Sequence, residues 1–149
     1  MTIKSWILST LAGAALTVAQ AGELTWLTDL PKAQTLAKTE KKAVLVVFTG
    51  SDWCPPCMKL KAEVLDSAEF QKYAKEKLVL VELDFPRKKT LPDDQKKANA
   101  ALRDKYQVRG FPTLLLLGSD GAKLGQKVGY GGTGPAAVIK ELNEFAAGK

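Results

Sequence analysis

The sequence predicts an α/β fold in which a central mixed β-sheet is flanked by helices on both faces. The continuous apolar run at residues 43–48 has the composition of a strand buried on both sides, and the segment at residues 78–84 is predicted to be a second buried strand. Segments with helical spacing of apolar residues alternate with these runs, as expected for helices that cover a sheet. Two later strands joined by a turn at residues 118–121 form a hairpin, which adds antiparallel pairing to the sheet.

The first helix is expected to begin after Asp29. An aspartate is a preferred N-cap because its carboxylate accepts hydrogen bonds from the free N–H groups of the first turn. Pro31 falls in that turn, where its missing N–H leaves no helical hydrogen bond unmade. Apolar residues then recur at helical spacing, and the face expected to be buried consists of Leu30, Ala33, Leu36 and Ala37.

The middle of the chain is expected to alternate strands and helices. The run at residues 43–48 is the first strand, and a helix follows over about residues 55–65. Ser67 has a side chain suited to cap a helix at residues 68–77. The second strand is predicted at residues 78–84. This alternation places helices against the sheet.

The last part of the chain is expected to supply a helix, a hairpin and a closing helix. A polar loop after the second strand leads to an alanine- and lysine-rich helix at about residues 94–106. The third strand is predicted at residues 113–117 and the fourth within residues 122–130. Pro135 suits the first position of the final helix. The face of that helix expected to be buried consists of Ala136, Ile139, Leu142 and Phe145.

A chain of 149 residues predicts one domain by default. Residues 1–21 are interpreted as a secretory signal peptide, because Lys4 precedes a short apolar stretch that ends in "AQA". Cleavage after Ala21 would leave residues 22–149 as the folded domain, in the periplasm or otherwise exported, without stable membrane insertion. Retention of the segment as a membrane anchor is the alternative.

Composition excludes several function classes. The net charge of +6 is modest and the lysines are spread along amphipathic segments, so a soluble basic surface is preferred over nucleic-acid binding. The chain has no histidine, which excludes Ser-His-Asp and Cys-His catalysis and every metal site with an imidazole ligand. Two thiolates alone do not complete a zinc site, and no pair of acidic residues has the spacing needed to supply the remaining ligands. We therefore expect no metal and no cofactor.

The only two cysteines, Cys54 and Cys57, are separated by Pro55 and Pro56. Cys54 directly follows a buried strand and opens a helix, where free N–H groups and the positive end of the helix dipole favour a thiolate. A cysteine with a pKa of about 8.5 is ionised to about 3% at neutral pH, whereas a pKa of about 7 would leave it half ionised. We therefore expect Cys54 to be the more accessible and more reactive thiol.

The two prolines limit this activation. Each lacks an N–H group that could have approached the Cys54 sulfur, which leaves the Cys57 N–H as the main close donor. A moderately stabilised thiolate suits a reductant better than a strong oxidant. A structural disulfide is the alternative, but it would gain only about 2 kcal/mol for a loop of about four residues, against about 3 for fifteen. A metal chaperone is a further alternative, and the position at a helix start favours a redox pair over both.

The stretches "VLVVFTGSDWCPPC" and "VRGFPTLLLL", with the hairpin and helix that follow, are similar to the thioredoxin superfamily and to bacterial exported thioredoxin-like proteins in particular. The resemblance extends from about Leu24 to the C-terminus. It implies a thioredoxin fold, with residues 22–149 as a thioredoxin-like domain. It also implies that Cys54 is the attacking thiol and Cys57 the resolving thiol.

The resemblance further implies a substrate-binding surface. Trp53 would be the aromatic neighbour of the cysteines and Pro112 the cis-proline opposite them, with Phe111 and Thr113 on either side. In the family, this proline exposes extended backbone with which a client peptide pairs as an added strand. From the residues alone, Trp53 and Phe111 could equally be packing residues and Pro112 a strand-entry proline. The residues interpreted as supporting the site are Pro55, Pro56 and Asp52.

One departure from the family concerns the proton of the resolving thiol. Thioredoxins bury an aspartate in the strand before the cysteines, whereas Val47 stands at about that place here. The candidate acceptors are Asp52 beside the motif, and Glu82 or Asp84 at the end of the second strand. Acids at such positions are more often solvated than basic, and in that case water would deprotonate Cys57.

These observations predict an exported thiol–disulfide oxidoreductase that reduces or exchanges disulfides of envelope proteins. Its expected partners are disulfide-containing client proteins and a membrane electron donor. A net oxidant or isomerase is the alternative within the same chemistry, and a binding or chaperone module without turnover is the alternative outside it. The basic residues Arg87, Lys88 and Lys89 are expected at the same sheet edge as the cysteines, either as a solvated loop or as a surface that selects acidic partners.

Overall fold

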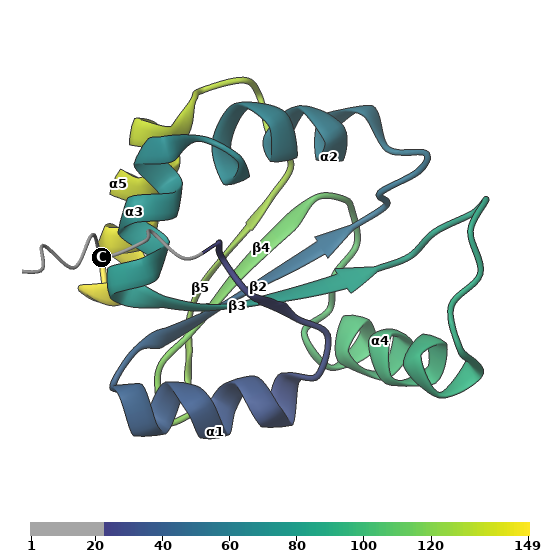
Figure 1. The fold of residues 1–149 in the computed structure, drawn as a ribbon, viewed down its shortest axis with the longest axis horizontal. Coiled ribbons are helices and arrows are strands. Elements are labelled where there is room, and N and C mark those ends of the chain that lie inside the picture. The colour runs from purple at the N-terminus through teal and green to yellow at the C-terminus, as the bar shows by residue number, and fades with distance from the viewer. Residues whose placement is uncertain (1–22) are drawn as a thin grey trace, which may run out of the picture.

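The computed structural model describes residues 23–149, which form a five-stranded mixed β-sheet with helices on both faces (Figure 1). The predicted fold class is confirmed. The segment interpreted as a signal peptide, residues 1–21, lies outside the described residues. The strands are β1 (Trp26–Leu27), β2 (Ala43–Thr49), β3 (Leu78–Asp84), β4 (Thr113–Leu117) and β5 (Lys123–Val128).

Strand β2 lies at the centre of the sheet, whose order is β1-β3-β2-β4-β5. It pairs in parallel with β3 on one side and antiparallel with β4 on the other. Strands β4 and β5 form the expected hairpin. Nearly every residue of β2, β3 and β4 is buried because helices cover both faces of the sheet. This explains why their sequences are mostly apolar rather than alternating, with the polar residues Thr49, Glu82, Asp84 and Thr113 near the strand ends.

The helices are divided between the two faces of the sheet, with α1 and α4 on one side and α2, α3 and α5 on the other (Figure 1). In the described part of the chain, no helix has both the length and the apolar character that crossing a bilayer requires. A π-helical turn, Lys61–Leu65, follows α2 directly. The bounds are α1 (Leu30–Glu40), α2 (Pro55–Leu60), α3 (Ala68–Lys77), α4 (Asp93–Lys105) and α5 (Pro135–Ala146).

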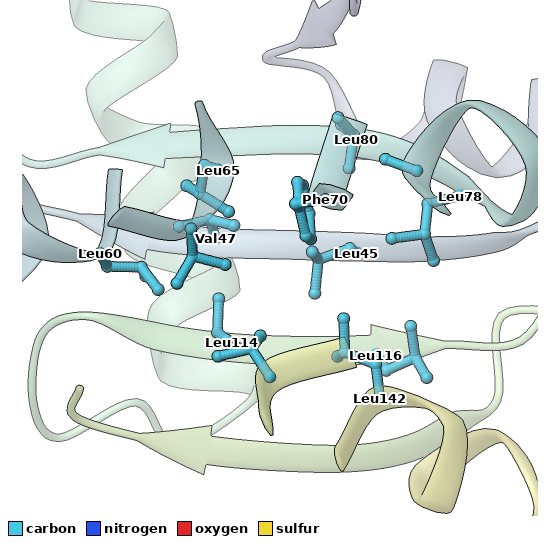
Figure 2. Packing of buried hydrophobic residues seen from close by; sticks show 13 residues of the cluster. Leu45, Val47, Leu60, Leu65, Phe70, Leu78, Leu80, Leu114, Leu116 and Leu142 are labelled. Atoms are coloured by element: carbon cyan, nitrogen blue, oxygen red, sulfur yellow. The ribbon is translucent and has the colours of Figure 1, made fainter. Parts of the chain in front are cut away.

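Each face of the sheet has its own hydrophobic core. On the side of α2, α3 and α5, Phe70 is completely buried in a cluster with Leu45 and Leu116 of the sheet (Figure 2). On the other side, Phe48 belongs to a second cluster with Ala33 of α1. Neighbouring residues of β2 alternate between the two clusters, so the strand is anchored in both. The point at which the chain leaves the sheet, just before the cysteines, is fixed by this double anchoring.

Two N-caps that the sequence predicts are confirmed. The carboxylate of Asp29 accepts a hydrogen bond from the N–H of Lys32 at 3.0 Å. The hydroxyl of Ser67 accepts one from the N–H of Phe70 at 3.2 Å. Each bond satisfies a donor that has no partner within its helix. The caps therefore set where α1 and α3 begin.

The expected buried face of α1 is wrong at one position. Leu36 is 40% exposed. The surface of α1 that contacts the sheet is narrower than the apolar pattern suggests, because two of its three buried residues are alanines that let the helix lie close. The buried residues of α1 are Leu30, Ala33 and Ala37.

The expected buried face of α5 also needs correction. Ala136 is exposed, whereas Val138, which the sequence analysis did not assign to the core, is fully buried together with Leu142. Ile139 and Phe145 are partly buried at the margin of the cluster. The buried residues of α5 are therefore spaced four apart, whereas the expected ones were spaced three apart. Because an α-helix has 3.6 residues per turn, positions spaced three apart gradually turn away from the sheet.

Element boundaries differ in three places. The helix expected at residues 55–65 changes to a π-turn after Leu60, where the N–H of Asp66 bonds to the C=O of Lys61 at 2.9 Å. The fourth strand is shorter than residues 122–130. The two-residue strand β1 was not predicted, because two residues carry no periodicity.

Candidate active site

Cys54 and Cys57 form a disulfide, with Cα atoms 5.3 Å apart. Cys54 is the N-cap of α2, and its backbone is extended, while Pro55 occupies the first helical position. The N–H of Cys57 lies 3.3 Å from the Cys54 sulfur. This is the close donor that the two prolines were expected to leave. In the reduced protein, such a donor stabilises a thiolate on Cys54.

Gly50, which the sequence analysis did not single out, holds both cysteines from the strand side. Its N–H donates to the Cys57 sulfur at 3.5 Å, and its C=O accepts from the N–H of Cys54 at 2.9 Å. A Cβ at this position would collide with the indole of Trp53, so the close packing requires glycine. The sequence signal that could have identified Gly50 is its position directly after a buried strand, because glycine there often allows another group to pack closely against the backbone.

Both cysteines are buried in this oxidised state, Cys54 to 3% exposure and Cys57 to 4%. The expectation that Cys54 is clearly the more accessible of the two is therefore wrong for this state. The physical reason is that the Cys54 sulfur turns back over the first turn of α2, toward the Cys57 N–H, instead of projecting from the surface. Pro55 and Pro56 are exposed beside the pair.

Three aromatic side chains from separate segments gather beside the cysteines. The indole N–H of Trp53 donates to the C=O of Phe85 at 2.7 Å. The ring of Trp53 meets Phe111 edge to face, with centroids 5.8 Å apart. Phe85 and Phe111 have centroids 5.1 Å apart. The structure thus brings together Trp53 and Phe111 and adds Phe85, which was not among the residues expected at the site.

The loop before β4 contains a cis peptide bond between Phe111 and Pro112. The C=O of Pro112 accepts a hydrogen bond from the N–H of Gly129 at 2.7 Å. By contrast, the backbone N–H and C=O of Phe111 have no hydrogen-bond partner within residues 23–149. Thr113 is completely buried, and its hydroxyl donates to the C=O of Gly110 at 2.7 Å. Thr113 therefore holds the loop from its buried side.

Asp52 is hydrogen-bonded to the loop that follows β3. Its carboxylate accepts hydrogen bonds from the N–H groups of Arg87, Lys88 and Lys89, at 2.9, 2.8 and 2.9 Å. These bonds, above all that from Arg87, lower the pKa of Asp52 to about 2. A carboxyl group with so low a pKa is a poor proton acceptor at neutral pH. Asp52 organises the loop instead.

Asp84, at the end of β3, is held in the ionised form. Burial alone would raise its pKa, but the Lys89 ammonium 2.8 Å away outweighs this effect, together with hydrogen bonds from the N–H and hydroxyl of Ser51. The pKa of Asp84 therefore lies below its ordinary value. The same contact raises the pKa of Lys89. Asp84 is a structural ion-pair partner rather than a free base.

Glu82 has the opposite character. Burial, and then the negative charge of Asp84, raise the pKa of Glu82 above its ordinary value. Glu82 pairs in register with Val47, the residue at the place of the aspartate that thioredoxins bury. It also lines the same pocket as Cys57, with a volume of about 300 Å³. Of the three acids considered from the sequence, Glu82 alone combines a raised pKa with a pocket shared with Cys57.

The arrangement as a whole provides sulfur chemistry. It has a disulfide at the start of α2, a backbone N–H directed at each sulfur, and an acid with a raised pKa in the pocket that Cys57 lines. No group of three or more histidine, cysteine or acidic side chains that could hold a metal ion is found in residues 23–149. The chemistry that the site can perform is thiol–disulfide exchange.

A family model for a thioredoxin-like domain matches residues 30–146. The chain belongs to this family. The solved structure of a DsbH oxidoreductase has a TM-score of 0.78 with 30% sequence identity, covering 97% of this chain and 95% of that chain. A thioredoxin from Thermus thermophilus has a TM-score of 0.61 with 22% identity, covering 83% of this chain and 87% of that chain, and it shares the fold. The thioredoxin fold expected from the sequence is confirmed.

Two curated relatives from Chlamydia pneumoniae are similar in sequence to this thioredoxin-like protein. The chain is 37% identical to the disulfide bond reductase DsbH over 106 residues, which are 71% of this chain and 63% of that relative. It is 35% identical to the thioredoxin-related protein DsbJ over 94 residues, which are 63% of this chain and 27% of that relative. The matched part therefore spans less than two thirds of the length of either relative.

The raised pKa of Glu82 predicts that replacing this carboxyl group stabilises the protein in a pH-dependent way. The folded protein holds the Glu82 proton more tightly than the unfolded chain does, so stability falls as the pH rises from 4.5 through the folded pKa. The Glu82→Gln variant lacks this loss. We expect its free energy of unfolding to exceed that of the wild type at neutral pH, and the excess to shrink toward acidic pH.

Urea denaturation of both proteins at a series of pH values measures this difference. Glu76→Gln, on the exposed side of α3, is the matched control for the loss of one carboxylate. A Glu82→Gln effect that is the same at every pH would contradict the raised pKa.

Proposed function

We propose that this protein is a thiol–disulfide oxidoreductase that reduces or exchanges disulfides of client proteins through Cys54 and Cys57. The observation that carries the proposal is the position of the Cys54 sulfur at the start of α2, 3.3 Å from the Cys57 N–H. This N–H and the helix dipole stabilise a thiolate, which is the reactive form in disulfide exchange. The names of the two relatives, a disulfide bond reductase and a thioredoxin-related protein, agree with this chemistry.

The reaction consists of two exchange steps and transfers two electrons to the client. The Cys54 thiolate attacks one sulfur of a client disulfide, forming a mixed disulfide and releasing the other client sulfur as a thiolate that takes up a proton. Cys57, once deprotonated, attacks the Cys54 sulfur. The second client sulfur leaves and is protonated in turn. The client then carries two thiols, and the Cys54–Cys57 disulfide has formed.

Glu82 is proposed as the acceptor of the Cys57 proton. Its raised pKa lies closer to neutrality than that of an ordinary carboxyl group, which favours proton exchange under working conditions. The pocket of about 300 Å³ that both residues line is large enough for water molecules to relay the proton. Asp52 and Asp84 are poor candidates because their pKa values are lowered.

Client binding is proposed for the surface formed by Trp53, Phe111 and Pro112. The N–H and C=O of Phe111, which are free within residues 23–149, can bond to an extended client segment as an added strand. The ring of Trp53, which meets Phe111 edge to face, supplies an apolar wall beside that segment. The buried hydroxyl contact of Thr113 keeps the loop in position.

We infer that the net direction is reduction. Pro55 and Pro56 have no N–H to offer the Cys54 sulfur, so the Cys57 N–H is the close donor within the described residues. A thiolate stabilised to this limited extent gives a reducing couple rather than a strong oxidant. The name of the DsbH relative, a disulfide bond reductase, supports the same direction.

We also propose that the protein works outside the cytoplasm. The sequence up to Ala21 has the pattern of a secretory signal, which would direct residues 22–149 as a single domain to the cell envelope. An oxidising compartment would return the cysteines to the disulfide, so sustained reduction requires a donor of electrons. A membrane protein is proposed for that donor, and envelope proteins with disulfides are proposed as the clients.

The reduction potential tests the direction of electron flow. We expect a value nearer to about −270 mV than to about −120 mV, because Cys54 receives limited thiolate stabilisation. Equilibration in glutathione buffers, followed by alkylation and mass analysis, measures it. A value of about −130 mV or higher would reverse the inferred direction and favour an oxidant or isomerase.

The Cys57→Ser variant tests whether the site turns over. Without a resolving thiol, the mixed disulfide between Cys54 and its client persists, so covalent adducts with envelope proteins are expected on non-reducing gels. The matched control, Cys54→Ser, should form far fewer adducts. If Cys57→Ser traps no client and the wild type does not accelerate insulin reduction, the fold serves binding without turnover.

A further inference from the structure

The loop between β3 and α4, residues 85–92, is fixed to the edge of the active site. The carboxylate of Asp52, two residues before Cys54, accepts hydrogen bonds from the N–H groups of residues 87–89. With a pKa of about 2, Asp52 is ionised at neutral pH and keeps these bonds. The Lys89 ammonium adds an ion pair to Asp84 at 2.8 Å. The loop backbone therefore has a defined position relative to the cysteines.

Arg87 lies directly over Trp53. Its guanidinium carbon is 3.7 Å from the centroid of the indole ring, a stacked arrangement that leaves the N–H donors at the guanidinium edge available. Arg87 and Lys88 are both exposed. Within residues 23–149, neither of them forms an ion pair. Arg87 therefore lies beside Trp53, the residue that precedes Cys54, and Lys88 follows it in the loop. The charge of Lys88 is attracted by the Asp52 carboxylate, but within residues 23–149 the two side chains form no ion pair.

A hollow of about 340 Å³ lies between this loop and α4. Among the described residues, Asp84 is the only acid in its lining, and Asp84 is already bonded to Ser51 and Lys89. The two cations from α4 are paired with acidic neighbours on that helix. The basic residues that line the hollow are Arg87, Lys88, Lys89, Lys96 and Arg103. Its potential is therefore positive, with Arg87 and Lys88 unpaired.

We propose that this hollow, with Arg87 and Lys88, binds an acidic segment of the client next to the client cysteine that joins Cys54. The inference rests on the proposed function and names a class of substrate for the same site. Arg87 covers one face of Trp53, and the Trp53 and Phe111 rings meet edge to face. A client strand that pairs with the backbone of Phe111 would therefore pass the two cations within a few residues of its cysteine.

A protein segment with several carboxylates fits this surface better than a single small anion. Arg87 and Lys88 are exposed, and an exposed ion pair contributes little by itself. A segment whose carboxylates pair with both cations at once gains the sum of two small contributions to the binding free energy. The guanidinium of Arg87 can also hold a carboxylate through two parallel hydrogen bonds. Exposed charges of this kind mainly raise the rate of association and select between partners.

The test compares three peptides of equal length, each with one cysteine in a disulfide with 5-thio-2-nitrobenzoate. The residues that flank the cysteine are glutamates in one peptide, glutamines in the second and lysines in the third. The second-order rate constant for reduction by the reduced protein is measured from the colour of the released thiol. We expect the glutamate peptide to react fastest and the lysine peptide slowest, about fivefold or more apart at low salt, with the difference shrinking as salt is added.

Charge variants locate the preference. Arg87→Gln/Lys88→Gln removes both unpaired cations, and Lys88→Gln alone leaves the stacking on Trp53 intact. The matched control, Lys38→Gln/Lys72→Gln, removes the same net charge from exposed positions on α1 and α3. We expect the ratio of the glutamate to the lysine rate to fall by about threefold or more in the double loop variant. It should fall partly in Lys88→Gln and stay close to the wild-type value in the control.

The outcomes separate this inference from the proposed function. If all three peptides are reduced at equal rates, the protein is an oxidoreductase without this preference, and the inference is wrong. If the control lowers the ratio as much as the loop variant does, the preference follows net charge, and the hollow is not a docking surface. If no peptide is reduced, the proposed function fails, and the inference fails with it.

Discussion

The contact between the Cys57 N–H and the Cys54 sulfur, at 3.3 Å, is the interaction on which the rest of the site depends. It exists because β2, buried on both faces at the centre of the sheet, delivers the chain to the start of α2 in a fixed position. Pro55 and Pro56 begin that helix without offering N–H groups of their own. The fold thus activates one sulfur and also limits how far the activation goes, and this limit sets the expected direction of electron flow.

The three acids near the cysteines differ in role because they differ in their hydrogen-bond and ion-pair partners, not because they differ in residue type. Asp52 holds three backbone N–H groups and Asp84 holds Lys89 and Ser51, so both stay ionised and act as structural anchors. Within residues 23–149, Glu82 has no comparable partners, and burial raises its pKa. One acid therefore positions the basic loop, the second secures it, and the third is the one proposed to exchange protons with Cys57. The proposed client surface follows from the same division, because Asp52 keeps Arg87 over Trp53.

Features with a local chemical signal could be predicted from the sequence. The caps Asp29 and Ser67, the apolar strands and the cysteine pair at a helix start are each encoded within a few residues. Features that depend on distant contacts could not be predicted. The choice among Asp52, Glu82 and Asp84 rests on bonds such as that between Asp52 and the Arg87 N–H, which are 35 residues apart. The exposure of Leu36 likewise depends on how closely α1 approaches the sheet.

The reactivity of Cys54 in the native reduced protein tests the central claim most directly. Iodoacetamide is added at a series of pH values, and the alkylated residue is identified by mass spectrometry, with the protein unfolded in urea as the reference. The account predicts that Cys54 is modified first and that its rate reaches half its maximum below a pH of about 8.5, the value for an ordinary cysteine. A Cys54 that reacts only after unfolding, or that titrates like the unfolded reference, would contradict the account.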